Sequence, residues 1–129
     1  ILGNHHIVAV DLPGMAEIEA ELTQFRQLQK EVQRIQGLRQ QALAQVNENE
    51  MVIQELGFLE EDAKVYKLIG PVLVQQDLVE VKANVSKRVD YIKGDVTRID
   101  QQLAGAEKKI EEQRAKIAKM QQQGGVAKK

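Results

Sequence analysis

The fold is decided by a short β-rich stretch near the middle of the chain, Val65-Tyr66-Lys67-Leu68-Ile69-Gly70-Pro71-Val72-Leu73-Val74. Gly70 can adopt a positive φ and Pro71 fixes its own φ near −65°, so the pair favours a tight turn between strands at 65–69 and 72–75. Apolar side chains occupy both faces of each strand, and such strands are buried on both faces. A lone two-stranded hairpin is marginally stable in water, and no other part of the sequence indicates β structure. We therefore expect other chains to pair with this hairpin and cover it. A hairpin folded only against its own helices is the alternative, but it would leave both strand edges open.

Two long helical stripes flank the hairpin. Their core-type positions alternate in steps of three and four, which average the 3.5-residue period of a left-handed coiled coil. We expect helices over about 16–59 and 77–123, and the short connection between them favours an antiparallel pair. The predicted fold class is mainly α, a long antiparallel two-helix coiled coil with a central β-hairpin. The stripe positions are Phe25, Leu28, Val32, Ile35, Arg39, Ala42, Val46, Asn49, Ile53 and Leu56 in the first helix, and Val85, Val89, Ile92, Val96, Ile99, Leu103, Ala106, Ile110, Gln113, Ile117 and Met120 in the second.

Two polar residues interrupt the first stripe. We interpret Arg39 as lying along the seam with its guanidinium in water. Asn49 either fixes the register of the two helices, as single core asparagines can, or is merely tolerated.

The second helix carries recognisable local signals. Asp77 and Glu80 form a D-x-x-E capping box, in which Asp77 accepts a bond from the amide three residues on. Gly124-Gly125 is expected to end the helix, and Lys116 is expected to pair with Glu112 one turn earlier.

The composition excludes several classes of protein. The chain has 129 residues, enough for one domain, but only 3% are aromatic, which argues against a large globular core. It has no cysteine, which rules out disulfides, thiolate metal sites and cysteine catalysis and fits a reducing compartment such as the cytoplasm. A net charge of −1 offers no basic field for nucleic acid, and no apolar run approaches the roughly 18 residues of a membrane span. Without a phosphate-binding loop or a catalytic constellation, we expect no enzyme activity and no cofactor.

The two ends of the sequence differ from the middle. We interpret residues 1–14 as a disordered leader or cloning remnant, residues 15–123 as the folded domain and residues 124–129 as a disordered tail. The adjacent His5 and His6 are a weak metal-site signal, because neighbouring histidines point in different directions on most backbones.

The hairpin, together with Lys87-Arg88-Val89-Asp90-Tyr91-Ile92, closely resembles the β-class subunits of prefoldin, and within them the eukaryotic subunit-6 group. The resemblance covers residues 15–123, and the GPVLV corner between long heptads is its specific part. It implies a hetero-hexamer with other α- and β-class subunits, in which the hairpins form an intermolecular β-barrel. It also implies an ATP-independent holdase that binds non-native proteins, such as actin and tubulin, and delivers them to the cytosolic chaperonin.

The resemblance also implies roles for particular residues. An antiparallel fold brings the start of the first helix beside the end of the second, and partial fraying of this tip would expose apolar side chains to clients. Met and Phe suit a surface that accepts varied apolar segments. The alternative is a closed seam that simply ends there. The assembly residues would be Val65, Leu68, Ile69, Val72, Leu73 and Val74, and the client-binding tip would comprise Ile18, Leu22, Phe25, Leu28, Ile110, Ile117 and Met120.

Two other functions are compatible with a helical hairpin. One is an arm that grips RNA, which would need a basic stripe that this balanced sequence lacks. The other is a structural coiled-coil oligomerisation module, which would not need a hairpin that is apolar on both faces.

Overall fold

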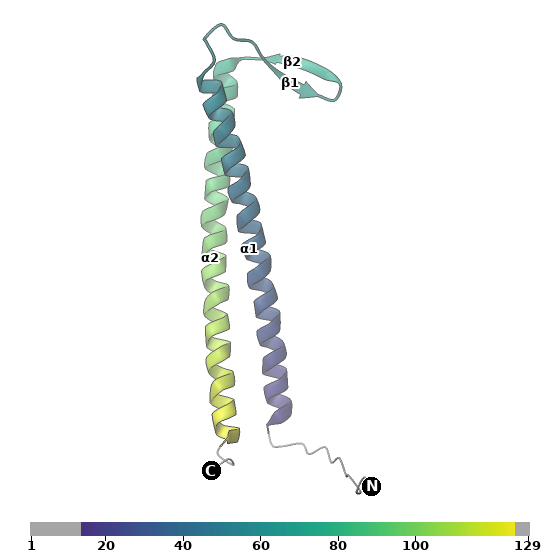
Figure 1. Ribbon diagram of the computed structural model, residues 1–129, viewed down its shortest axis with the longest axis vertical. Helices are drawn as coiled ribbons and strands as arrows, with labels where there is room; N and C mark the ends of the chain where they lie inside the picture. Colours follow the sequence, from purple (N-terminus) through teal and green to yellow (C-terminus); the bar gives the residue numbers. More distant parts are fainter. Residues whose placement is uncertain (1–13, 126–129) are drawn as a thin grey trace, which may run out of the picture. The chain divides into compact units, whose positions relative to one another are not determined.

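The structure is a computed structural model that describes residues 14–125. Figure 1 shows the order of its elements, α1 (Met15–Gly57), β1 (Val65–Ile69), β2 (Val72–Gln76) and α2 (Leu78–Gly125). Two long helices flanking one antiparallel hairpin confirm the predicted, mainly helical fold. The chain divides into two compact units. The hairpin unit comprises Gln33–Ala104, and the end unit comprises the remaining parts of α1 and α2, 14–32 and 105–125 among the described residues.

In the hairpin unit, α1 and α2 are held together by two apolar clusters. Ala42 and Val46 of α1 pack with Val89 and Ile92 of α2. A second cluster takes residues from the end of α1 and the start of α2, namely Leu56, Leu78 and Val85, with Ile53, Val65 and Val81 packed against them. Moving back along α1 therefore matches moving forward along α2, so the helices are antiparallel in this unit. The predicted stripe is confirmed, because its residues make up the whole of the first cluster and half of the second.

The seam of the end unit is buried unequally. Ala106, Ile110 and Ile117 of α2 are buried, whereas every buried residue of α1 lies in the hairpin unit. The apolar residues that α1 contributes to the seam of the end unit are only half-buried, namely Ile18, Leu22, Phe25, Leu28 and Val32. The end unit therefore has a thinner apolar core than the hairpin unit.

Polar contacts across the seam supplement the clusters of the hairpin unit. Arg39 lies along the seam with its side chain 40% exposed, as expected, and its Nε also donates to Asp100 Oδ1 at 2.6 Å. Asn49 donates to the Gln45 carbonyl at 2.7 Å, and its Oδ1 accepts from Arg88 Nη1 at 3.4 Å. Because Asn49 joins α1 to α2, the structure supports its interpretation as a register-fixing residue.

The helix ends differ from the sequence predictions in detail. Asp77 does cap α2, but its Oδ1 accepts from the amide of Val79 at 3.0 Å rather than from Glu80. Both positions in the first turn have free amides, and the sequence pattern does not choose between them. Helix α2 also continues through Gly124 and Gly125, because glycine lowers helix stability by about 1 kcal/mol without forcing a stop.

Candidate functional site

The hairpin has a tight two-residue turn. Ile69 pairs with Val72 across it, and Leu68 pairs with Leu73 one step further from the turn. Gly70 has a φ of +57°, and the following proline requires a negative φ. A positive φ followed by a negative one is the type II′ pattern, whose twist suits antiparallel strands. Gly70 and Pro71 thus form the tight turn that the sequence predicted.

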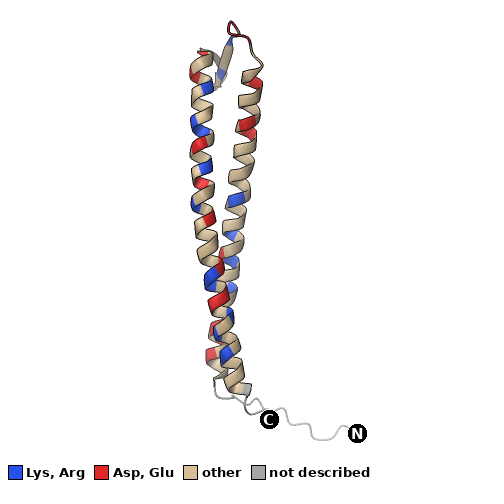
Figure 2. Ribbon diagram, turned by 90° about the vertical axis from the view of Figure 1, so that its left-hand side faces the viewer, with Lys and Arg blue, Asp and Glu red and all other residues tan. Residues whose placement is uncertain are grey.

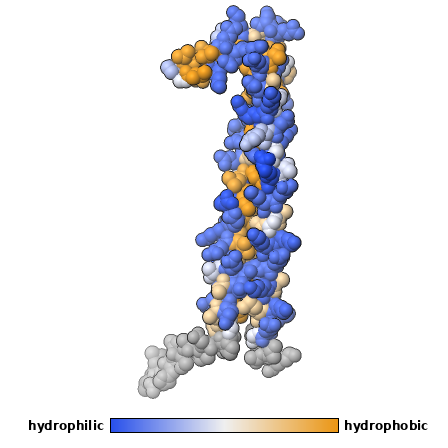
Figure 3. All heavy atoms as spheres, turned by 180° about the vertical axis from the view of Figure 1, so that it is seen from behind, coloured by the Kyte–Doolittle hydropathy of each residue, from blue (hydrophilic) through white to orange (hydrophobic). Residues whose placement is uncertain are grey.

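Both faces of the hairpin carry exposed apolar side chains. Leu68 and Leu73, on one face, are 67% and 64% exposed, and Ile69 and Val72, on the other, are 53% and 55% exposed. Only Val65, at the base, packs against an apolar cluster of the helices. Figure 3 shows hydrophobic side chains gathered at the far end of the hairpin. The structure therefore does not fold this hairpin against its own helices.

Both edges of the hairpin are open as well. The described residues form one sheet, which contains only β1 and β2. The outer side of each strand therefore presents backbone donors and acceptors that have no strand partner, which makes it a template for further strands. The assembly role of the six predicted hairpin residues stays a prediction. All of them except the half-buried Val65 have the exposure that such a role requires.

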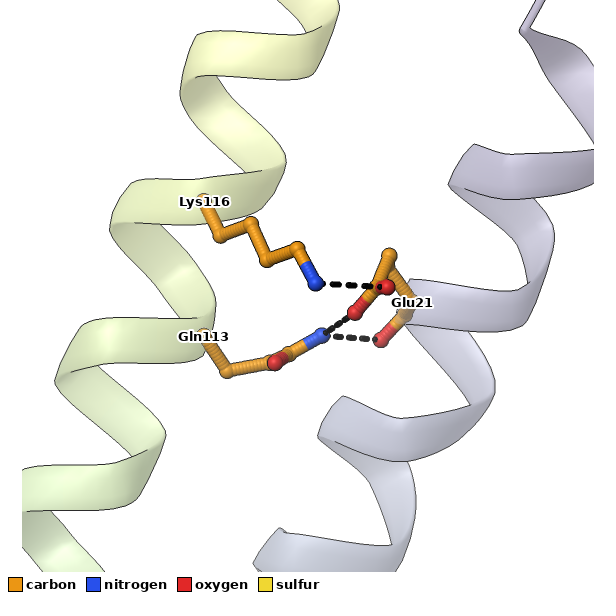
Figure 4. Close-up of polar contacts among 3 residues, drawn as sticks. All are labelled: Glu21, Gln113 and Lys116. Carbon is orange, nitrogen blue, oxygen red and sulfur yellow. Dashed lines mark hydrogen bonds and ion pairs between the residues drawn. The ribbon is translucent and has the colours of Figure 1, made fainter.

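The end unit contains a polar cluster around Glu21 (Figure 4). The side-chain amide of Gln113 donates to the Glu21 main-chain carbonyl at 3.0 Å and also to the Glu21 carboxylate. Lys116 Nζ donates to the same carboxylate at 2.9 Å. The hydrogen bond from Gln113, and then the one from Lys116, hold the pKa of Glu21 below its usual value, although partial burial acts in the opposite direction. We call Glu21, Gln113 and Lys116 the polar clasp.

Close to the clasp, an arginine covers one of the predicted tip residues. The guanidinium of Arg114, the residue after Gln113, lies 5.6 Å from the centre of the Phe25 ring. This is a cation–π distance. Glu21 and Phe25 are one turn apart on α1, so α2 contacts two successive turns of α1 through polar or charged groups.

The seven predicted tip residues all fall on the seam of the end unit. Ile110 and Ile117 are 9% and 8% exposed. The others are half-buried: Ile18, Leu22, Phe25, Leu28 and Met120. The seam is closed in this structure, and client binding by these residues stays a prediction. The sequence alone did not indicate a role for Glu21. The polar Gln113 at a seam position did indicate that it has a hydrogen-bond partner on the facing helix, and that partner is Glu21.

Charge on the helices is mixed. Figure 2 shows Lys and Arg interspersed with Asp and Glu along both helices, in keeping with 18 basic and 19 acidic residues in the chain. A phosphate backbone would favour a continuous basic stripe, so this surface does not support the RNA-gripping alternative.

The described residues also lack a cluster of metal ligands and a membrane-spanning helix. Residues 14–125 contain no group of three or more histidine, cysteine or acidic side chains arranged to hold a metal ion. In the same range no helix is apolar enough over sufficient length to cross a membrane. The paired histidines His5 and His6 lie outside the described residues.

A two-stranded hairpin that is apolar on both faces lies between two antiparallel helices, and this arrangement suits the subunit of a larger assembly. The Prefoldin subunit family model matches residues 19–124, and the chain belongs to this family. It is 45% identical over 106 residues to prefoldin subunit 6 of Arabidopsis thaliana, with 82% of each chain covered. It is 40% identical over 107 residues to prefoldin subunit 6 of Homo sapiens, with 83% of each covered.

A solved structure shares the fold. The crystal structure of the prefoldin beta subunit from Thermococcus strain KS-1 is similar to this chain with a TM-score of 0.75 and 21% identity, covering 83% of this chain and 92% of that one. The predicted resemblance to prefoldin subunits is thus confirmed. The chain has the general role of its family, a chaperone subunit that oligomerises with other prefoldin subunits, and prefoldin subunits are chaperones rather than enzymes.

Proposed function

We propose that this chain is a subunit of a hexameric, ATP-independent holdase in the cytoplasm. The complex would bind non-native polypeptides, including actin and tubulin, and deliver them to the cytosolic chaperonin. The observation that carries the proposal is the hairpin, whose two apolar faces and two edges are open in a chain that belongs to the prefoldin subunit family.

The hairpin supports the assembly part of the proposal. Leu68 and Leu73 pair with each other on one face and remain about two-thirds exposed. Burying apolar surface of this kind is favourable by roughly 25 cal/mol for each Å² removed from water. A neighbouring strand would also form backbone hydrogen bonds with the open strand edges. Strands from neighbouring subunits would supply both, closing the hairpins into an intermolecular β-barrel.

The end unit supports the client-binding part. Its α1 segment has no buried residue among those described, so its apolar seam residues are only partly shielded from water. Segments with few buried contacts open at low free-energy cost. Opening would present the apolar seam, including Ile110, Ile117 and Met120, to an unfolded chain. No nucleotide is needed for such an exchange of apolar contacts.

The test is suppression of client aggregation by the assembled complex. Changing Ile117 and Met120 to serine should weaken protection of diluted, denatured actin, because two apolar seam side chains are lost. The matched control is the Ala115→Ser, Ala118→Ser variant, which places the same residues on exposed positions of the same turns. Light scattering reports aggregation, and native mass spectrometry of the same sample reports hexamer content.

A shortened chain ending at Lys109 gives the stronger form of the test. It should still assemble through its hairpin but protect less than the serine variant, and the defect should be partial because several subunits hold one client together. Equal protection by intact, serine and shortened complexes at every client concentration would overturn client binding by this subunit and favour the structural module.

A further inference from the structure

The clasp occupies a place in the seam where an apolar residue is expected. Gln113 lies between Ile110 and Ile117 in the three-four repeat, and both of these isoleucines are buried. An amide in such a position loses apolar contact and must satisfy its hydrogen bonds locally. Gln113 does so by donating to the main chain and the carboxylate of Glu21 on the facing helix.

The clasp contributes more to closing the end unit than a similar contact would in the hairpin unit. In the hairpin unit, buried residues from both helices meet in each apolar cluster. Among the described residues of the end unit, 14–32 and 105–125, only those of α2 include buried ones. The Glu21 side chain is 22% exposed against 58% for Lys116, so the carboxylate is the sheltered centre on which both α2 side chains converge.

From this geometry we propose that Glu21, Gln113 and Lys116 form a latch that keeps the end-unit seam closed, and that opening the latch sets how much of the Ile110 and Ile117 surface a client can reach. The effect of the latch on client access rests on the proposed client-binding role, whereas its closure of the seam concerns this chain alone. Arg114 over Phe25 adds a neighbouring contact, so the latch spans two turns of α1.

The groups around Glu21 fit a latch that depends on a negative charge. From α2, the cations Lys116 and Arg114 lie at this site, one on the carboxylate and one over the adjacent Phe25 ring. On its own helix, Glu17 lies one turn before Glu21. Neutralising Glu21 removes the acceptor for Lys116 and weakens the bond from Gln113.

The experiment is hydrogen–deuterium exchange of the full chain carrying Glu21→Ala. Alanine is the best helix former, so faster exchange cannot come from lost helix propensity. We expect amides in 14–32 and 105–125 to exchange about two- to fivefold faster than in the parent chain, the scale of losing a partly exposed charged contact. Amides in 33–104 should be unchanged. Glu19→Ala is the matched control, since it removes the same charge at an exposed position on the same helix.

A second arm separates the latch from the proposed function. Complexes carrying Glu21→Ala should hold more denatured client per hexamer than those carrying Glu19→Ala. If exchange in the end unit is the same for both variants, the latch is overturned. If exchange rises but client holding does not, the latch closes the seam without regulating clients, and the assignment of client binding to this seam is wrong.

Discussion

Charged substitutions in the hairpin should prevent assembly while leaving the isolated chain intact. We consider Leu68→Lys combined with Val74→Asp. The register places residue 74 opposite Lys67, so the new aspartate faces a cation and the hairpin itself can still form. Neither residue belongs to the apolar clusters of the helices, so helicity and thermal unfolding of the isolated chain should barely change.

The expected loss of binding free energy between subunits can be calculated from the exposed fractions of the two side chains. Leu68 is 67% exposed and Val74 is 39% exposed. An interface that buries both side chains is therefore stabilised by about these fractions of the free energy of transferring each whole side chain out of water. Full burial of such a side chain contributes about 1.5–3 kcal/mol, which gives about 2–3 kcal/mol for the two. Each 1.4 kcal/mol is tenfold in affinity, so binding to partner subunits should weaken by about 30- to 140-fold. Burying the new charges weakens it further.

The assay is native mass spectrometry of the chain mixed with its partner subunits over a concentration series. Met51→Lys with Val79→Asp is the matched control, because it adds the same two charges at residues that are 61% and 73% exposed on the helices. The control should assemble like the parent chain. Normal hexamer yield from the hairpin variant at low concentration would refute the assembly role of the hairpin.

Three further predictions concern the two seams. Ile92→Ala should cost about 2–5 kcal/mol of unfolding free energy in denaturant titrations, because Ile92 is 8% exposed in the cluster shared by both helices; a cost below about 0.5 kcal/mol would contradict that packing. A double-mutant cycle on Arg39 and Asp100 should give a coupling of only about 0.2–1 kcal/mol that fades with salt, since their side chains are 40% and 47% exposed. The Gln113 bond and the nearby ammonium lower the pKa of Glu21, so its stabilising effect is present at neutral pH and is lost as pH falls through that lowered value. The difference in end-unit exchange between the parent and the Glu21→Ala chain should therefore shrink as the pH falls below the ordinary glutamate pKa of 4.5 and through the lowered pKa of Glu21. A pH-independent difference would contradict the role of the charge.

The seam positions could be predicted from sequence because they depend on local periodicity. Three-four spacing forces residues such as Val46 and Val89 onto one helix face, and a helix with one apolar face packs it against a partner. The hairpin could be predicted for a similar reason, since Gly70 and Pro71 fix the turn within two residues. Both features require only information from neighbouring residues.

The clasp could not be predicted in the same way. The sequence suggested Glu112 as the partner of Lys116, one turn away, but the ion pair in the structure joins Lys116 to Glu21 on the other helix. That contact depends on how far the two helices slide along each other, which a single sequence specifies only loosely. The helix end beyond Gln123 was missed because glycine permits a stop without requiring one.

The most direct test of the central claim is light scattering of denatured actin diluted into the reconstituted hexamer. The measurement compares complexes assembled with and without this chain, each in the presence and absence of ATP. We expect that only complexes containing the chain assemble and protect fully, and that ATP changes nothing, because a holdase works by exchanging apolar contacts. Equal protection from mixtures lacking the chain, or protection that appears only with ATP, would contradict it.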